Sequence, residues 1–301
     1  MKLVLANNQS KKFVAFHSGM QTEENVYDYS DYKSLLFHFE KGNAGVLNVQ
    51  SGKQLDAYDG VYINGYMQTT EIAYALATVL DHLNIAYVDR ELKNAPSHSK
   101  LTAYAKLSTK DVDIPMTYAG SAYALTIASK KGMLRSLALP LVVKRADADR
   151  GIDNFIFNTY EEIENLLSKA EDLSVWLVQE FIPNKGFYLL NITHDELNYG
   201  VFRTLQKRPD DRRELAHMYK PHGGSNARLI EKTDIPQVAI TESLKAVKAM
   251  NRQIATVDLI YEDATNRARI LEVNYNPQLI TAPTFKERKQ SVFLKAIKTI
   301  E

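Results

Sequence analysis

Residues 254–277 read IATVDLIYEDATNRARILEVNYNP, and this stretch decides the fold prediction. Apolar side chains recur through residues 257–263 and again through 269–274, in short runs that are typical of strands. The polar residues 264–267 between the two runs indicate a turn. The stretch is therefore expected to form a β-hairpin.

The expected hairpin carries two carboxylates that should face each other. A turn centred on Thr265 places Asp258 opposite Glu272, and directly opposed residues have Cβ atoms about 4.5–5.5 Å apart. Asn274 follows two residues later, on the same face. Opposed like charges destabilise a sheet unless a cation lies between them, and Mg²⁺ prefers such oxygen ligands. Asp258, Glu272 and Asn274 therefore form a candidate magnesium site. The alternative is a pair of acids on a solvent-exposed edge, which the apolar flanking residues disfavour.

Composition limits the class of protein. The chain has 301 residues, 45% of them hydrophobic and 24% charged, which is typical of a globular protein of about two domains. Its 37 basic and 36 acidic residues show no excess that would suggest a nucleic-acid partner. The absence of cysteine excludes disulfides and thiolate metal sites. No apolar run suits a signal peptide or a membrane helix, so a cytoplasmic location is expected and no membrane partner.

The rest of the chain reads as alternating strands and helices. In the first 95 residues, strands are expected at 3–6, 45–49, 61–63 and 85–88, and a helix at 69–83. The segment Asn94-Ala95-Pro96-Ser97 predicts a domain boundary. Beyond it, one helix is expected from 100 towards 114, running into a loop at 111–115. Two more helices are expected after Thr159, with a capping box to Glu162, and at 237–250. Further strands are expected at 141–144, 175–182, 187–193 and 199–205.

Seven short strings, in order, resemble the ATP-grasp superfamily, in particular the RimK-type ligases, which include glutamate ligases and resemble glutathione synthetases. The strings are Ser99-Lys100-Leu101 with Ile114-Pro115-Met116-Thr117, Leu141-Val142-Val143-Lys144, Arg150-Gly151-Ile152, Val178-Gln179-Glu180-Phe181-Ile182, His222-Gly223-Gly224, Val257-Asp258-Leu259, and Leu271-Glu272-Val273-Asn274-Tyr275-Asn276-Pro277. The resemblance implies an α/β protein with the ATP-grasp fold, in which two α+β subdomains clamp ATP. An N-terminal α/β domain (1–95) would precede the ATP-grasp domain (96–301), itself divided into a nucleotide-binding part (about 96–186) and a metal and substrate part (about 187–301).

The resemblance also implies a reaction. An ATP-dependent carboxylate–amine ligase first converts the carboxylate to an acyl phosphate, which an amine then attacks, with release of ADP and phosphate. The implied cofactors are ATP and Mg²⁺, as two ions, with Mn²⁺ as a substitute. The implied partners are small-molecule or peptide substrates, and the oligomeric state is left open. Two alternatives are a small-molecule kinase on the same fold and a nucleotide-binding module without catalytic activity.

Individual residues acquire roles by the same resemblance. Lys100 and Lys144 would contact the ATP phosphates, and Arg150 and Gly151 would belong to a lid over them. Gln179, Glu180, Phe181 and Ile182 would form the hinge that binds adenine. The candidates for holding the acyl phosphate or substrate carboxylate are Arg203 and Arg213, since an arginine fork suits oxyanions. Gly223, Gly224 and Asn276 would line the substrate site.

The chain departs from the family pattern just after the expected hinge. Relatives have an acidic residue there for the ribose hydroxyls and an arginine two positions later, but this sequence has Tyr188 and Leu190. The expected phosphate and metal contacts are unaffected. The sequence also lacks the glycine-rich phosphate loops and the nucleophile elbow of other enzyme classes.

Overall fold

The computed structural model describes residues 1–5, 27–63, 69–88, 92, 99–147, 154–193, 195–204, 227–252 and 254–274. The chain divides into two compact units. The first unit comprises Met1–Thr109, Met116–Ala148 and Asp153–Phe181. The second comprises Lys110–Pro115 and the chain from Ile182 onward, together with residues 149–152.

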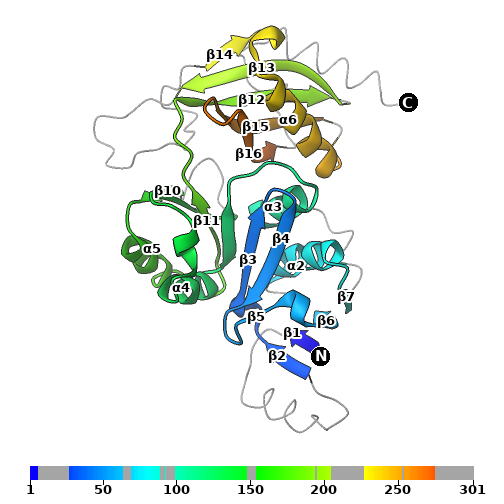
Figure 1. Cartoon of the computed structure of the whole chain (residues 1–301), viewed down its shortest axis with the longest axis vertical. Coiled ribbons are helices and arrows are strands. Elements are labelled where there is room, and N and C mark those ends of the chain that lie inside the picture. Colours follow the sequence, from blue (N-terminus) through cyan, green and yellow to red (C-terminus); the bar gives the residue numbers. More distant parts are fainter. Residues whose placement is uncertain are drawn as a thin grey trace. The chain divides into compact units, whose positions relative to one another are not determined.

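Strands of the first unit form a parallel sheet and a larger antiparallel sheet (Figure 1). The parallel sheet has the order β2 (Tyr27–Ser30), β1 (Lys2–Leu5), β6 (Gly60–Ile63), β7 (Ala86–Val88). The large sheet has the order β10 (Asn154–Phe157), β9 (Leu141–Arg145), β11 (Val175–Glu180), β8 (Thr117–Ser121), β3 (Leu35–Glu40), β4 (Asn43–Asn48), β5 (Lys53–Gln54). The helices are α2 (Thr70–His82), α3 (Lys100–Thr109), α4 (Ala122–Lys130) and α5 (Tyr160–Leu167), with 3₁₀ turns η1 (Tyr32–Ser34), η2 (Leu55–Ala57) and η4 (Met133–Ser136).

The two faces of the large sheet have different characters. One face packs Leu141, Val143 and Val178 against α4 and α5 in a buried apolar core. The other face carries Lys144 and Gln179, because Lys144 is paired with Leu177, and Gln179 lies two residues beyond Leu177. Helix α3 packs on β3 and β4 of this sheet. The sheet therefore separates an apolar core from a face with buried polar groups.

Replacing Gly120 with alanine should destabilise the first unit. A Cβ atom at Gly120 would lie 2.6 Å from the backbone oxygen of Leu35, so two central strands would have to separate. The expected loss is about 1–3 kcal/mol of unfolding free energy, the usual range for overpacking. Gly45→Ala is the matched control, because its nearest neighbour would be the Gln54 side chain at 3.9 Å. Urea denaturation should separate the two variants; equal midpoints would contradict the prediction.

The second unit contains an antiparallel sheet crossed by one described helix (Figure 1). The strand order is β14 (Ala227–Ile230), β13 (Glu196–Thr204), β12 (Gly186–Thr193), β15 (Ile254–Glu262), β16 (Arg267–Asn274). Helix α6 (Gln237–Ala249) follows the 3₁₀ turn η5 (Lys232–Asp234) and packs on β12, β13, β15 and β16. Leu190, Val257 and Leu259 project from one face of the sheet and are fully buried. The opposite face carries the candidate metal ligands.

Most predicted elements are present, and the capping box of Thr159 and Glu162 is confirmed. The helix expected from residue 100 towards 114 is shorter than predicted: α3 ends at Thr109. Asp111 has a φ of 57°, which stops the helix, and the following residues extend along β16, where Ile270 N donates to Asp113 O at 2.8 Å. The sequence patterns gave no indication of β3, β8, β10 or α4, because segments as short as these show no distinct periodicity.

Strands from the first 95 residues contribute to both sheets of the first unit. β3 pairs with β8, so the hairpin of β3 and β4 extends the large sheet across the expected boundary at residue 95. That boundary stays a prediction. In the part of the chain that is described, no helix combines the length and the hydropathy needed to cross a bilayer.

Candidate active site

The C-terminal hairpin brings the three candidate metal ligands together. Asp258 pairs with Glu272, as the sequence predicted, and Asn274 pairs with Thr256. The Asn274 amide nitrogen donates to Asp258 Oδ1 at 3.2 Å. The register shifts between Asp258 and Leu259. In the half of the hairpin next to the turn, Leu259 pairs with Ile270, so the single register assumed from the sequence is wrong there. A bulge at Leu271 therefore sets the register of the candidate site.

The environment of Asp258 disfavours its ionised form and so raises its pKa. Burial, followed by the neighbouring Glu272 carboxylate, raises the pKa of Asp258 to about 8. The Arg203 guanidinium and the hydrogen bond from Asn274 act in the opposite direction but do not outweigh them. A divalent cation would favour ionised Asp258, since it adds the positive charge that this carboxylate lacks.

Arg203 reaches this site from another strand. It pairs with Phe187 on β12, and Leu189, two residues later, pairs with Asp258. Arg203, Asp258 and Glu272 consequently project from the same face of the sheet, opposite the buried face. The face thus combines two carboxylates, an amide and a guanidinium.

The donor set fits Mg²⁺. Asp258 and Asn274 are half-buried and Glu272 is exposed, so an ion could keep several water ligands. Among the described residues, no three His, Cys, Asp or Glu side chains cluster as a metal site, and the candidate set here has only two carboxylates with an amide. One or two carboxylates with nucleotide phosphates is the usual magnesium arrangement.

The lysines expected to bind phosphate lie together in the first unit. Lys144 is 6% exposed, and its Nζ atom is 5.5 Å from the centre of the Tyr104 ring on α3. Lys100 Nζ donates to the backbone oxygen of Ala146 at 3.4 Å, two residues beyond Lys144. The fold thus brings α3 and the end of β9 together and places both ammonium groups at one end of that strand.

The expected hinge is tied to the start of β8. Gln179 Nε2 donates to Thr117 Oγ1 at 2.8 Å, and Glu180 Oε1 accepts from Met116 N at 2.8 Å. Glu180 N also donates to Met116 O at 3.0 Å. With its amide nitrogen directed to Thr117, Gln179 would offer Oε1 as an acceptor. The chain passes from the first unit to the second between Phe181 and Ile182.

The two departures from the family pattern lie on the buried face of the C-terminal sheet. Tyr188 pairs with Leu259 and stacks edge-on against Phe202, with ring centres 5.0 Å apart. Leu190 is fully buried beside Gly200. Neither side chain shares the face of Asp258.

Other predicted site residues cannot be placed. Arg150, Gly151, Arg213, Gly223, Gly224 and Asn276 lie outside the described residues. Their roles stay predictions.

The structure adds three neighbours that the sequence analysis did not assign to the site. Met116 and Thr117 support the hinge residues through the hydrogen bonds above, although about sixty residues of chain separate the partners. Burial raises the pKa of Glu71 on α2, while Ser99 and Lys100 oppose the shift and Asp147 adds to it. No local pattern indicated these contacts, because each joins distant segments.

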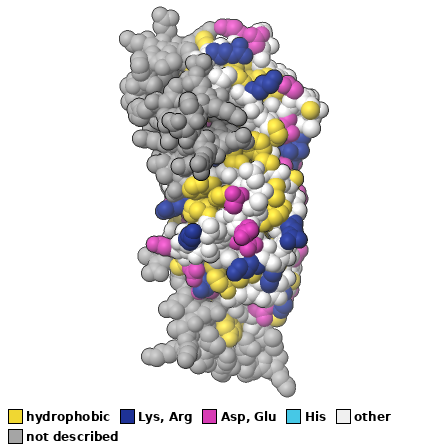
Figure 2. Space-filling model, turned by 90° about the vertical axis from the view of Figure 1, so that its left-hand side faces the viewer, with side chains coloured by type: hydrophobic (Ala, Val, Ile, Leu, Met, Phe, Trp, Pro, Cys, Tyr) yellow, Lys and Arg dark blue, Asp and Glu magenta, His cyan; other side chains and the backbone are white. Residues whose placement is uncertain are grey.

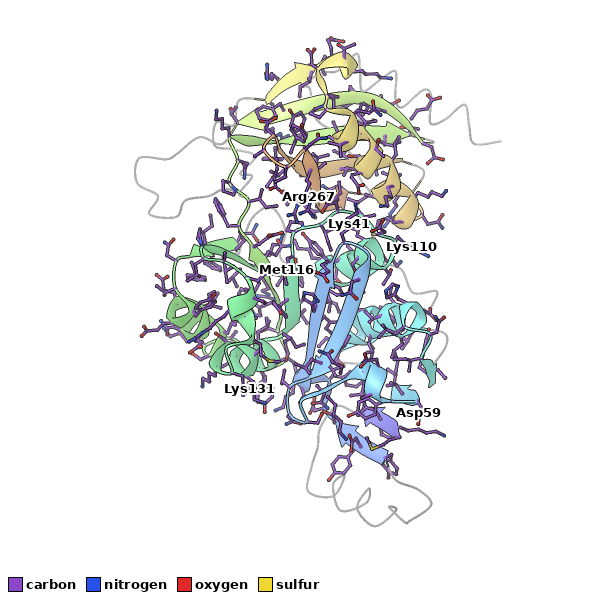
Figure 3. All side chains as sticks on the ribbon, viewed as in Figure 1. Lys41, Asp59, Lys110, Met116, Lys131 and Arg267 are labelled. Carbon is purple, nitrogen blue, oxygen red and sulfur yellow. The ribbon has the colours of Figure 1, made fainter. Side chains whose placement is uncertain are left out.

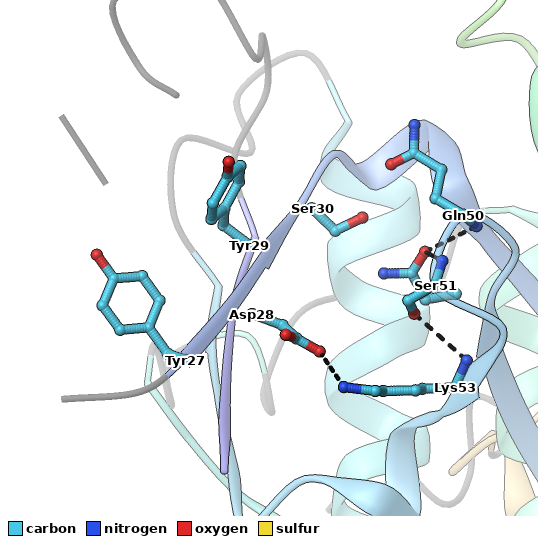
Figure 4. Close-up of a pocket in the computed structure, with 8 residues that line it drawn as sticks. Tyr27, Asp28, Tyr29, Ser30, Gln50, Ser51 and Lys53 are labelled. Carbon is cyan, nitrogen blue, oxygen red and sulfur yellow. Dashed lines mark hydrogen bonds and ion pairs between the residues drawn. The ribbon is translucent and has the colours of Figure 1, made fainter. Parts of the chain in front are cut away.

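A separate polar cavity of about 220 Å³ lies in the first unit (Figure 4). Asp28 on β2 accepts from Lys53 and from the Tyr58 hydroxyl, each at 2.8 Å. Burial raises the pKa of Asp28, but these hydrogen bonds outweigh it and hold the pKa below its usual value. The lining residues include none of the predicted nucleotide or metal ligands.

Charged and hydrophobic side chains are mixed on one face of the described part of the molecule (Figure 2). On the face drawn in Figure 2, acidic and basic side chains of the described residues are interspersed among hydrophobic ones.

Comparison with known proteins identifies the class. Residues 98–294 match the family model of the RimK-like ATP-grasp domain. The chain therefore belongs to the RimK-like ATP-grasp family and is an ATP-grasp ligase. Enzymes of this family bind ATP and Mg²⁺ and ligate carboxylates to amines. No curated protein matches the sequence significantly.

Solved structures show the same fold. D-alanyl-alanine synthetase A from Vibrio cholerae O1 biovar eltor str. N16961 aligns with a TM-score of 0.52 and 14% identity, over 99% of this chain and 97% of that one. D-alanine–D-alanine ligase from Bacillus anthracis aligns with a TM-score of 0.50 and 15% identity, over 99% and 94%. At these identities the similarity establishes the fold alone.

Proposed function

We propose that this protein forms an amide or peptide bond between a carboxylate and an amine, through an acyl phosphate, and releases ADP and phosphate. The observation that carries the proposal is the pairing of Asp258 with Glu272, with Asn274 and Arg203 on the same sheet face. Transfer of a phosphoryl group needs positioning and charge neutralisation more than covalent help from the protein. The substrates are small molecules or peptides.

Each group on this face has a role in the proposed chemistry. Asp258, Glu272 and Asn274 hold Mg²⁺, in the proposal as two ions, with Mn²⁺ as a substitute. The bound metal would neutralise charge on the transferring phosphoryl group. Arg203 and Arg213 are the candidates for orienting the acyl phosphate, which a planar guanidinium can bind in bidentate fashion. Gly223, Gly224 and Asn276 are the candidates for substrate contacts.

The proposed nucleotide contacts come from residues 96–186. Lys100 and Lys144 bind phosphate oxygens, and Arg150 and Gly151 cover them. Gln179 accepts a hydrogen bond from the adenine amino group through Oε1. The Glu180 N–H already donates to Met116 O. The proposed contacts to the adenine edge are therefore the Glu180 carbonyl and the Ile182 amide, with Phe181 between these two residues.

Oxygen-18 in the carboxylate substrate tests the proposed mechanism. The carboxylate oxygen attacks the γ-phosphorus, and the amine then attacks the acyl carbon, so the C–O bond breaks and the bridging oxygen leaves with phosphate. Incubation with MgATP and pools of labelled amino acids or peptides should give ADP, an amide product and one labelled oxygen in phosphate.

Each other outcome of this experiment excludes the proposal. A stable phosphorylated product without free phosphate would identify a kinase. ATP binding without turnover on any pool would identify a nucleotide-binding module. Unlabelled phosphate with an amide product would exclude the acyl phosphate.

Replacing Lys144 with methionine should weaken ATP binding by about tenfold to a hundredfold, since a hydrogen bond to a charged group contributes about 1.5–3 kcal/mol. Methionine keeps the buried aliphatic stem but removes the charge, so the fold should persist. Lys130→Met, at the exposed end of α4, is the control. Calorimetry with ATP measures the change; unchanged affinity in folded Lys144→Met would exclude this contact.

A further inference from the structure

A short segment of chain runs beside β16, the strand that carries Glu272 and Asn274. Residues Lys110–Pro115 follow α3 in the sequence but belong to the second unit. β16 is the last strand of the described sheet, so its outer edge is available for pairing. Figure 3 labels Lys110, where the segment begins, and Arg267, at the start of β16. Within the segment, Asp113 is only 4% exposed.

The backbone of Asp113 is bonded on both sides. Its carbonyl accepts from Ile270 N at 2.8 Å, and its own N–H donates to Glu242 Oε2 on α6 at 2.9 Å. The segment is therefore held between the edge of β16 and the helix that covers the sheet.

The Asp113 side chain binds two arginines of β16. Arg267 donates to its two oxygens at 2.9 and 2.7 Å, and Arg269 Nε lies 3.6 Å from Oδ1. Arg269 Nη1 also donates to the backbone oxygen of Ile114 at 3.0 Å. A bidentate arginine–carboxylate pair fixes geometry as well as distance.

These contacts hold the residues that come immediately before the bulge. Arg269 and Ile270 are anchored, Leu271 is the extra residue, and Glu272 then faces Asp258. Without the extra residue, Leu271 would face Asp258 and Glu272 would lie opposite Val257 on the buried face. The position of the bulge thus decides whether two carboxylates can share one cation.

We propose that Asp113 is a positioning residue that, through Arg267 and Arg269, fixes the bulge at Leu271 and so keeps Glu272 opposite Asp258. The contacts of Asp113 described above are with Glu242, Arg267, Arg269 and Ile270, and none of these is a candidate metal ligand. The effect of Asp113 on metal binding rests on the proposed function, whereas its effect on strand register does not.

Replacing Asp113 with asparagine tests the effect on the metal. The change keeps the size and backbone of the residue but removes the charge that holds both guanidinium groups. Mn²⁺ binding in the presence of ADP should weaken by about tenfold or more, the range found when supporting residues around a metal site are changed. Asp111→Asn is the matched control, because Asp111 lies in the same segment and its side chain pairs with Lys245 at the surface.

Strand register can be read without metal, because the chain contains no cysteine. The pair Asp258→Cys with Glu272→Cys should oxidise readily, since disulfides need closely placed Cβ atoms. The pair Asp258→Cys with Leu271→Cys should oxidise poorly. Adding Asp113→Asn should lower the yield of the first disulfide and raise that of the second. Arg267→Lys keeps the positive charge but removes the bidentate guanidinium. It should shift the two disulfide yields in the same direction, and it replaces Asp113→Asn in the test if that variant does not fold.

The outcomes separate the two ideas. Unchanged disulfide yields in folded Asp113→Asn and Arg267→Lys would overturn the positioning role. A shift in these yields, together with a wild-type protein that binds no Mn²⁺, would support the positioning role and reject the proposed metal site.

Discussion

Replacing Glu272 with glutamine should lower ATP turnover by about a hundredfold or more, because a bound metal contributes several kcal/mol to stabilising charge in the transition state. The same change should leave the metal-free protein as stable as before or slightly more stable. Glu272 raises the pKa of Asp258, which shows that the two carboxylates repel each other. Removing one charge relieves that repulsion. Stability and activity should therefore move in opposite directions.

Glu262, on the same hairpin, is the comparison for Glu272, because it pairs with an arginine and not with another carboxylate. Glu262 Oε1 lies 2.8 Å from Arg269 Nε, and Arg269 is largely buried. Glu262→Gln removes the nearer of the two carboxylates that neutralise the buried Arg269 guanidinium, the other being Asp113, so the metal-free protein should lose stability. The measurements are thermal melting without metal, and turnover as a function of Mg²⁺ concentration, for both variants. If Glu272→Gln lowers the metal-free melting temperature and leaves the Mg²⁺ dependence unchanged, Glu272 is not a metal ligand.

The contribution of Asp258 to the unfolding free energy of the metal-free protein should decrease as pH rises from about 4 to about 8. The folded pKa of Asp258 is raised to about 8, from an ordinary value of 3.8. Between these values the folded state keeps a proton that the unfolded state has released, so each increase in pH favours unfolding. The slope cannot exceed about 1.4 kcal/mol per pH unit for one proton. Above the folded pKa the contribution becomes constant.

Asp258→Asn isolates this contribution from the other titrating groups. The stability of the variant relative to wild type should increase with pH over this window, and urea denaturation at several pH values measures the difference. A difference that does not change with pH would contradict the assignment of the raised pKa to Asp258.

Proton and metal should also compete for Asp258. The apparent affinity for Mg²⁺ in the presence of ADP should rise with pH until about 8 and then level off, because the ligand must be deprotonated. Calorimetry in two buffers with different ionisation enthalpies would count the proton released. Arg203→Met should move the levelling-off point upward, since Arg203 lowers the pKa of Asp258.

The sequence alone determined the features that depend on nearby residues. The hairpin of residues 254–274 was predictable because two strand patterns flank a short polar turn, and such a turn brings its own flanking residues together. The predicted pairing of Asp258 with Glu272 is present, but it depends on the bulge at Leu271, because the turn half of the hairpin follows a register one residue shorter. The capping box of α5 was predictable for the same reason, since Thr159 and Glu162 are three residues apart.

Tertiary structure alone decided the features that join distant segments. Arg203 reaches Asp258 only because β12 lies between β13 and β15, and Thr117 meets Gln179 only because β8 pairs with β11. The segment at Asp113 was predicted as a loop at the end of a longer helix, and only the structure shows that hydrogen bonds to β16 and α6 hold it in place. Side-chain periodicity reports which face of an element is buried and not which element covers it. The sequence could therefore predict two facing carboxylates, while the bulge, the arginines and the raised pKa of Asp258 required the assembled sheet.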